Sequence, residues 1–424
     1  MNSNIDMNEE IKNFSESHAE PAWLSELRQQ SFENVRKLEM PDIERVRFSG
    51  WKLDNTELSE SDENGAVPAF TEIPDYPMLV QLGTRTILEQ MSPELAAKGV
   101  VFTDFYQALE EIPDVMETYF ASATAANEDR LTAAHYAAFN SGAVLYVPDN
   151  VEIDLPMEGL FYQNAAEKVN FNKHILIVAG KHAKLNYLER LESQGEGTAK
   201  VTGTVFVEVI ALEGAQVKFS AIDRLGANVT AFISRRGLLG RDATIDWSIG
   251  VMNDGNVICD FDSDLKGNGS HAELKAVGIS MGRQIQGVDT RVTNYGKNSV
   301  GHILQHGVIL ERGTLTFNGI GHIINGAKGA DAQQESRVLM LSDTARADAN
   351  PILLIDENDV TAGHAASIGQ VDPEDMYYLM SRGLDEQAAK KLVIRGFLGS
   401  VIVNIPVKSV RDEFITTIDR KLGL

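Results

Sequence analysis

Three carboxylates occupy alternate positions in the middle of the chain, at Asp260, Asp262 and Asp264. If this stretch is a strand, alternate side chains point to the same face, so the three carboxylates would lie together. Paired carboxylates can serve as the acid and base of glycoside hydrolysis or can bind a hard metal ion. Acidic residues are frequent throughout the chain, so a solvated outer face is the favoured interpretation, and a carbohydrate-cleaving β-helix enzyme is the alternative.

Histidines provide a second candidate site. His302 and His306 are four residues apart, which places them on one side of a strand or a helix, and His322 follows. Imidazole is a good ligand for zinc and iron, so these side chains are candidate metal ligands. The spacing defines no third ligand, and hydrogen-bonded histidines are more common, so a structural role is favoured.

Two catalytic motifs are present only in part. Gly278, Ser280 and Gly282 match the G-x-S-x-G nucleophile elbow, which requires a strand that turns sharply into a helix. Strand patterns lie on both sides of this stretch, so the elbow is excluded. Neither Gly180-Lys181 nor Gly296-Lys297 is followed by the Ser or Thr of a phosphate-binding loop. We therefore expect that this chain is neither an ATPase nor another enzyme.

The charge of the chain restricts its partners. The 424 residues carry a formal net charge of -23. Nucleic acids and anionic membranes have the same sign of charge, so neither is expected to be the main partner. Residues 1–18 are polar and acidic, unlike a signal peptide, and the sequence contains no apolar run long enough to cross a bilayer. These features predict a cytoplasmic protein.

Cys259 is the only cysteine in the sequence. No disulfide can form within the chain, and a cysteine-rich metal site cannot come from this chain alone. We interpret Cys259 as a small buried hydrophobic residue.

An alternating pattern recurs through the middle of the chain and indicates how these residues are positioned. Apolar and polar residues alternate in each copy, which predicts a strand with one buried face. Copies recur in steps of about 30 residues, which is the signature of a solenoid. The apolar residues of the copies are Ala183, Leu185 and Tyr187; Ala215, Val217 and Phe219; Ala243, Ile245 and Trp247; Ala272, Leu274 and Ala276; and, more loosely, Gly313, Leu315 and Phe317. Between copies, Val205, Val207 and Val209 are also expected to point inward.

Changes of pattern divide the chain into four parts. We predict a disordered tail at 1–20, an N-terminal mainly helical domain at 21–140, a β-helix core at 141–368 and a C-terminal helical domain at 369–424. In the N-terminal domain, Thr86–Leu109 and Asp129–Phe139 have helical patterns. The terminal coils of such a solenoid need a cap or a partner, and the helical domains are candidates for caps.

Capping residues define the helices of the C-terminal domain. Asp372 before Pro373 is typical of a helix start, and Asp385 begins a second helix that we expect to end at Val393. A third helix is predicted over residues 407–422.

The end of the predicted solenoid carries residues that occur together in one known family. They are Asp359-Val360-Thr361-Ala362-Gly363-His364-Ala365-Ala366-Ser367-Ile368-Gly369, Asp372, Tyr377-Tyr378-Leu379, Ser381-Arg382-Gly383-Leu384 and Gly396-Phe397, with Phe317-Asn318-Gly319, Gly326-Ala327, Asp331-Ala332, Gln334 and Leu339-Met340-Leu341-Ser342 upstream. This set resembles the SufB and SufD scaffold proteins of Suf-type iron–sulfur cluster assembly.

The resemblance implies a mainly β fold, with a right-handed parallel β-helix core between N-terminal and C-terminal helical domains. It also implies a non-catalytic scaffold subunit that pairs with a SufB-like chain through the β-helix and docks a SufC-like ABC-type ATPase on residues 369–424. The iron–sulfur cluster would be transient and would belong to the complex, which could also bind a flavin. No cofactor is expected in the isolated chain, which could form a homodimer.

Within this family the chain is more similar to SufD. SufB proteins are similar in having a Cys in the strand before Leu339, where this chain has Glu335-Ser336. SufD proteins typically read Cys-Ser-His-Gly-Ala-Thr where only His364 remains here, and Ala362 stands in place of the Cys. The resemblance therefore implies His364 as a candidate cluster ligand at the partner interface, since imidazole can bind iron beside thiolates from another chain. A purely structural histidine is the open alternative.

Overall fold

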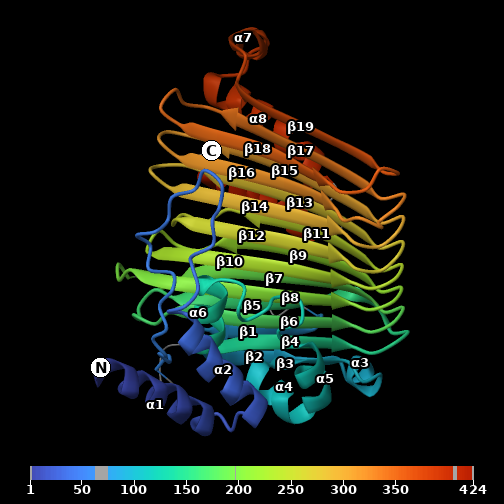
Figure 1. The fold of residues 1–424 in the computed structure, drawn as a ribbon. Coiled ribbons are helices and arrows are strands. Elements are labelled where there is room, and N and C mark those ends of the chain that lie inside the picture. Colours follow the sequence, from blue (N-terminus) through green and yellow to red (C-terminus); the bar gives the residue numbers. More distant parts are fainter. Residues whose placement is uncertain (1, 63–74, 196, 404–407, 423–424) are drawn as a thin grey trace.

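Two parallel β-sheets, wound around one axis, make up the body of the protein (Figure 1). The computed structural model describes residues 2–62, 75–195, 197–403 and 408–422. From β4 to β19, successive strands alternate between the two sheets, and from β6 onward each pairs in parallel with the strand one coil earlier. This arrangement is the predicted parallel β-helix.

The coils share one pattern of strands. Sheet A contains β5 (Glu152–Asn164), β7 (Lys184–Gln194), β9 (Gln216–Arg224), β11 (Thr244–Val251), β13 (His271–Ser280), β15 (Val300–Ile309), β17 (Asp331–Met340) and β19 (Thr361–Gln370). Sheet B contains β4 (Ser141–Val147), β6 (Phe171–Ala179), β8 (Val201–Ala211), β10 (Val229–Leu239), β12 (Val257–Leu265), β14 (Ile285–Asn294), β16 (Thr314–Ile323) and β18 (Arg346–Ile355).

The core lies between the sheets, where alternate side chains of each strand point inward. Val205, Val207 and Val209 are buried there, as predicted. The rings of Tyr187, Phe219 and Trp247 stack from coil to coil at centroid distances of 5.2 and 4.8 Å. Burying one such side chain stabilises the fold by about 1.5–3 kcal/mol, so each coil depends on its neighbours.

The predicted register is wrong in the later copies of the repeat. Ala272 lies beside Ile245, and Leu274 lies beside Trp247, so the fourth copy is displaced by two residues from the predicted correspondence. Leu315 belongs to β16 in sheet B and is not a further copy of the sheet A strands. A two-residue shift keeps the same side chains buried, which is why alternation predicts the face of a strand but not its register.

The N-terminal region closes the first coil with three short strands. In sheet A, β1 (Met78–Leu82) pairs in parallel with β5 and antiparallel with β2 (Arg85–Gln90). In sheet B, β3 (Val101–Asp104) pairs antiparallel with β4. The single helix predicted over Thr86–Leu109 is therefore wrong at β2 and β3, because these short apolar runs extend the sheets, and only the segments between and after them are helical.

Helices and an extended segment from the same region cover the outer face of sheet B. The helices are α2 (Ala22–Asn34), α4 (Phe105–Glu111), α5 (Pro113–Tyr119) and α6 (Arg130–Ala138), whereas α3 (Pro93–Ala97) packs Leu95 against the core between the sheets. Phe105, Met116 and Tyr136 pack against Leu176 of β6, and Ile43 and Phe48 belong to a second cluster on β8, β10 and β12. As predicted, α6 begins after Asp129, whose carboxylate caps it.

The segment predicted as a disordered tail, 1–20, contains helix α1 (Asn2–Ser17). Ile11 is buried against Phe32 of α2 and Ala137 of α6, and Phe14 is also buried. These two apolar residues, three positions apart, give a polar segment a docking face, and the prediction overlooked them.

Three helices follow the last coil. Asp372 and Asp385 cap α7 (Pro373–Ser381) and α8 (Glu386–Ile402), as predicted, although α8 continues well past Val393. The third is α9 (Lys408–Lys421), and Val407 of the predicted range lies outside the described residues. Helices α8 and α9 pack on the outer face of sheet A, whose last strand runs to Gln370 and not to 368. None of the helices in the described ranges is long and apolar enough to span a membrane.

Candidate functional site

The last coil of the solenoid is the most exposed part of the β-helix. The outermost strands are β18 in sheet B and β19 in sheet A, and within the described ranges no further strand pairs with them. Leu354, Ile355 and Ile368 are 43%, 44% and 43% exposed. An edge strand presents unpaired backbone N–H and C=O groups. This end of the solenoid, which we call the open end, therefore offers a partner the two edges of β18 and β19 and an apolar surface.

The backbone of each edge has a defined pattern of free donors. The N–H of Thr361 donates to the carbonyl of Ala330, the residue just before β17, so in the alternating pattern of a parallel strand the N–H of Ala366 points away from β17. The N–H of Arg346 likewise donates to Gly313, which places the nitrogen of Pro351 on the outer side of β18. Proline is tolerated on an edge for this reason, and it interrupts the row of donors there.

The interior of the last coils contains neutral polar side chains that hydrogen-bond from coil to coil. The hydroxyl of Ser336 donates to Gln305 Oε1 at 2.6 Å, and Gln305 Nε2 donates to Thr290 at 3.1 Å. Gln334 Nε2 donates to the carbonyl of Ile352 at 2.9 Å, whereas its buried Oε1 has no hydrogen-bond partner. A buried acceptor without a hydrogen-bond partner is unfavourable, so packing alone does not explain why a glutamine occupies this position.

His364 lies beside one member of that polar group. In β19 it is directly beside Gln334 of β17, which in turn lies beside Ile303 of β15. The imidazole is exposed and makes no hydrogen bond or ion pair with the described residues. Ala362, two positions earlier on the same strand, provides no ligand atom. One imidazole alone is a weak metal site, so any ion held here needs ligands from another chain.

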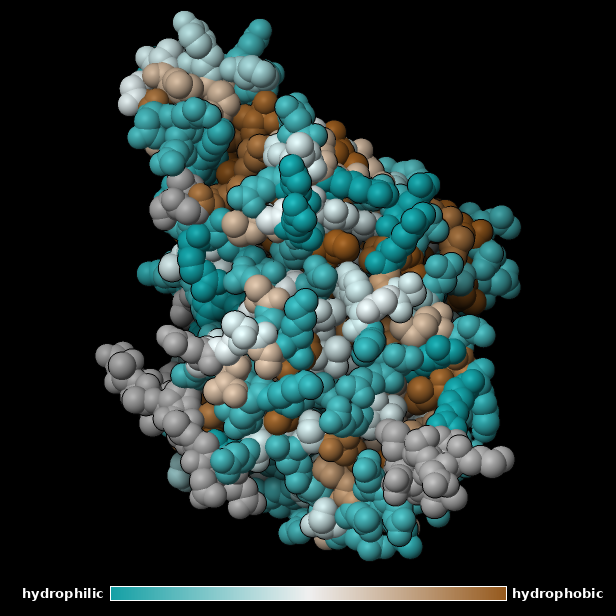
Figure 2. Space-filling view, turned by 90° about the vertical axis from the view of Figure 1, so that its left-hand side faces the viewer, coloured by the Kyte–Doolittle hydropathy of each residue, from teal (hydrophilic) through white to brown (hydrophobic). Residues whose placement is uncertain are grey.

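An apolar groove separates the last coil from α7. It has a volume of about 470 Å³ and is lined by residues that include Leu341, Met376, Tyr377, Met380 and Lys390. Tyr377 is 76% exposed, and α7 buries none of its side chains. In Figure 2, hydrophobic surface is visible between the topmost part of the molecule, where α7 lies, and the solenoid below it.

Comparison with known proteins decides the family. The SufBD core domain of SUF system FeS cluster assembly matches residues 161–397, and the SufBD protein N-terminal region matches residues 80–158. The chain belongs to the SufBD family. It is 42% identical over 427 residues to the iron–sulfur cluster assembly protein SufD of Bacillus subtilis, covering 98% of this chain and 97% of that protein. It is 24% identical over 416 residues to a SufBD family protein of Staphylococcus saprophyticus, covering 94% of this chain and 89% of that protein.

No thiol of this SufBD chain lies at the open end, because its single cysteine, Cys259, is elsewhere in the solenoid. Ser336 occupies an inward position and is bound to Gln305, while Glu335 points outward and lies 3.4 Å from His306. Cys259 is buried in the core, as predicted, and burial raises the pKa of its thiol well above the usual value. A thiolate ligand at the open end would therefore come from another chain.

The three aspartates share one face of β12, as predicted, but they are neither well solvated nor free. The Arg236 guanidinium lies 2.8 Å from Asp260, 3.4 Å from Asp262 and 3.1 Å from Glu128, which precedes α6. Burial, followed by the charge of Asp260, raises the pKa of Asp262 well above its usual value and that of Asp289 to about 6. A cavity of about 490 Å³ adjoins this network. The network joins the N-terminal region to sheet B, which explains the cluster without catalysis.

The three predicted histidines do not meet. His302 and His306 share the outer face of β15, but His306 is covered by α8 and lies 3.1 Å from the carbonyl of Phe397. His322 is in sheet B, 3.3 Å from Asp356. His302 lies instead near His271 and Glu273 of β13, a pair the prediction overlooked. The alternation of those two residues could have shown that they share a face, but only the register places His302 beside them.

The predicted exclusion of a nucleophile elbow agrees with the geometry around Ser280. Its hydroxyl donates to the carbonyl of Thr314 at 3.0 Å, and the next element is strand β14, not a helix. The side chain is buried and serves to close a turn.

Proposed function

We propose that this chain is a non-catalytic scaffold subunit of an iron–sulfur cluster assembly complex and that its open end is completed by a SufB-like chain. Membership of the SufBD family supports the role, and the exposed edges of β18 and β19 support the place of contact. Strand addition would satisfy the free backbone groups of both sheets, and the exposed Ile368 would be buried. In the absence of that partner, a second copy of this chain can occupy the same edges.

The ATPase of the complex docks, in this proposal, on the C-terminal helices. The groove beside α7 is apolar, and its rim carries an exposed tyrosine, Tyr377, of the kind that dominates protein interfaces. Because α8 packs on sheet A through Phe397 and Leu398, movement of a bound ATPase would reach the outer face of the solenoid directly. ATP hydrolysis belongs to that partner.

His364 contributes one ligand to a cluster built between the paired chains. The position of His364 supports this role, because the side chain is exposed on the edge strand β19, directly beside Gln334 of β17. The cluster is cargo of the complex. Because this chain has no cysteine at the open end, the remaining ligands in this proposal are thiolates of the partner. Replacing His364 with Ala should leave pairing intact and lower the iron and sulfide bound per reconstituted complex. Equal loading of the variant and the wild type would remove His364 from the cluster.

The pairing surface is tested by changing one backbone donor. Ala366→Pro removes an N–H that points away from β17, so the ladder between β17 and β19 is kept. We expect the variant to fold normally and to lose the SufB-like partner in size-exclusion chromatography with light scattering. Ala366→Thr is the matched control, because it keeps the N–H and should still pair. Normal pairing of Ala366→Pro would contradict the proposed edge contact.

A further inference from the structure

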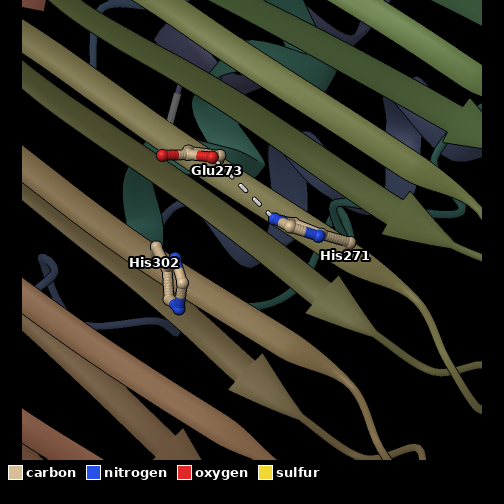
Figure 3. Close-up of side chains that lie close together, drawn as sticks. All are labelled: His271, Glu273 and His302. Carbon is tan, nitrogen blue, oxygen red and sulfur yellow. Dashed lines mark ion pairs between the residues drawn. The ribbon is translucent and has the colours of Figure 1, made fainter.

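Three potential metal ligands lie together on the outer face of sheet A, away from the open end. His271 and Glu273 are alternate residues of β13 and therefore point to the same side. His302 of β15 is directly beside Glu273 in the parallel register. Figure 3 shows the three side chains on these neighbouring strands.

The separation of the donor atoms suits a single small cation. One ligand atom from each residue lies within 4.8 Å of the other two, and His271 Nε2 is 3.9 Å from Glu273 Oε2. Zinc binds nitrogen and carboxylate oxygen at about 2.0–2.2 Å, so two ligands on one ion are at most about 4 Å apart. A side-chain adjustment of about 1 Å would bring all three donors to that distance.

The imidazoles have bonding capacity that the described residues do not use. His302 Nε2 is shielded from solvent yet has no hydrogen-bond partner. The nearest carboxylate oxygen, Asp331 Oδ2, is 3.7 Å away, which is too long for a hydrogen bond. The rings are 34% to 39% exposed, so an ion can reach them.

The local charge favours a cation. Glu273 and Asp331 are both carboxylates beside the two imidazoles. Lys275 is the opposing charge, with its ammonium 3.7 Å from Glu273 Oε1. The same ammonium lies 2.8 Å from Asp246, which neutralises it, so the balance around the three ligands is negative.

We propose that His271, Glu273 and His302 bind one divalent transition-metal ion. Two imidazoles and one carboxylate with open positions are the ligand set of zinc and related first-row ions, whereas calcium and magnesium prefer oxygen ligands alone. The ion would link β13 to β15. Asp331 adds negative charge beside His302.

The test is zinc binding to the full-length protein after removal of any histidine tag. Titration calorimetry with Zn²⁺ should give one site per chain, and Co²⁺ should give visible absorption typical of a low-coordinate nitrogen and oxygen site. His302→Ala should weaken Zn²⁺ binding at least 10-fold and remove the Co²⁺ bands. Glu273→Gln, which keeps the shape of the side chain, should also weaken binding, whereas Lys275→Ala should strengthen it.

His322→Ala is the matched control, because His322 is a partly exposed histidine paired with an acid in the other sheet. It should bind Zn²⁺ like the wild type, and circular dichroism should show that all variants fold. Zinc affinity that is the same in His302→Ala and Glu273→Gln as in the wild type would overturn the site. The site would also be overturned if His322→Ala weakened the Co²⁺ absorption bands as strongly as His302→Ala does.

Discussion

The two ends of the solenoid are finished in opposite ways. At the first coil, antiparallel strands β2 and β3 close both sheets, and the N-terminal helices cover the outer face of sheet B. At the last coil, no further strand in the described ranges pairs with β18 or β19, and none of the side chains of α7 is buried. The same repeat is therefore closed by the chain itself at one end and leaves two strand edges unpaired in the described residues at the other, which is where our proposal places the partner.

A buried polar network fastens the closed end. Glu208, on the outer face of β8, accepts hydrogen bonds of 2.8 Å from the backbone N–H groups of Ala121, Ala123 and Thr124, in the loop between α5 and α6. His174 lies 3.2 Å from the same carboxylate and 3.1 Å from His135. At the open end, by contrast, the exposed His364 has no hydrogen-bond partner among the described residues.

The largest effect is expected where this network is broken. Glu208→Ala leaves three backbone donors and a histidine without their acceptor, which should lower the free energy of unfolding by about 3–5 kcal/mol. His364→Ala, at the open end, should change it by less than about 0.5 kcal/mol. Denaturant unfolding of both variants measures the contrast. If the Glu208→Ala protein were as stable as the wild type, the network around Glu208 would not stabilise the closed end more than His364 stabilises the open end.

A smaller effect, on binding only, is expected at α7. Tyr377→Ser should weaken binding of the ATPase partner by about 2 kcal/mol, or roughly 30-fold, because an aromatic residue on the rim of the groove is removed. Tyr378→Ser is the matched control, since Tyr378 is also exposed but does not line the groove. Surface plasmon resonance gives both affinities. Equal losses in the two variants would place the ATPase elsewhere on the chain.

The smallest effect is a pH dependence confined to the closed end. Burial, and then the nearby His174, hold the pKa of His135 well below its usual value. The unfolded chain takes up this proton below about pH 6.5 and the folded chain does not, so stability falls as the pH drops below that value. The slope is at most about 1.4 kcal/mol per pH unit. Melting at pH 7.5 and 5.5 should show a smaller loss for His135→Gln than for the wild type, and an equal loss would contradict this role.

The sequence predicted what depends on alternation and on capping. Val205, Val207 and Val209 point inward because period-two alternation fixes the face of a strand, and Asp372 and Asp385 cap helices because their side chains bond to nearby backbone groups. These signals are local, so they can be read without knowing the fold.

What the sequence did not predict depends on distant neighbours. The short strands β2 and β3 form because sheet edges are available to them, and the register of the later coils depends on turns whose lengths differ. The grouping of His302 with His271 and Glu273 follows from that register alone. Whether a coil is closed or open depends on elements far away in the chain, and Pro351, which is tolerated on an edge strand, is a local difference between β18 and β16.

Hydrogen–deuterium exchange of the chain, alone and bound to its SufB-like partner, tests the central claim most directly. In the free chain, the outward amides of β19, such as that of Ala366, should exchange fast, while the amides of β4 should be protected. Binding should protect β18 and β19 and leave β3 and β4 unchanged. Protection gained at the closed end, with β18 and β19 still exchanging fast, would contradict the account.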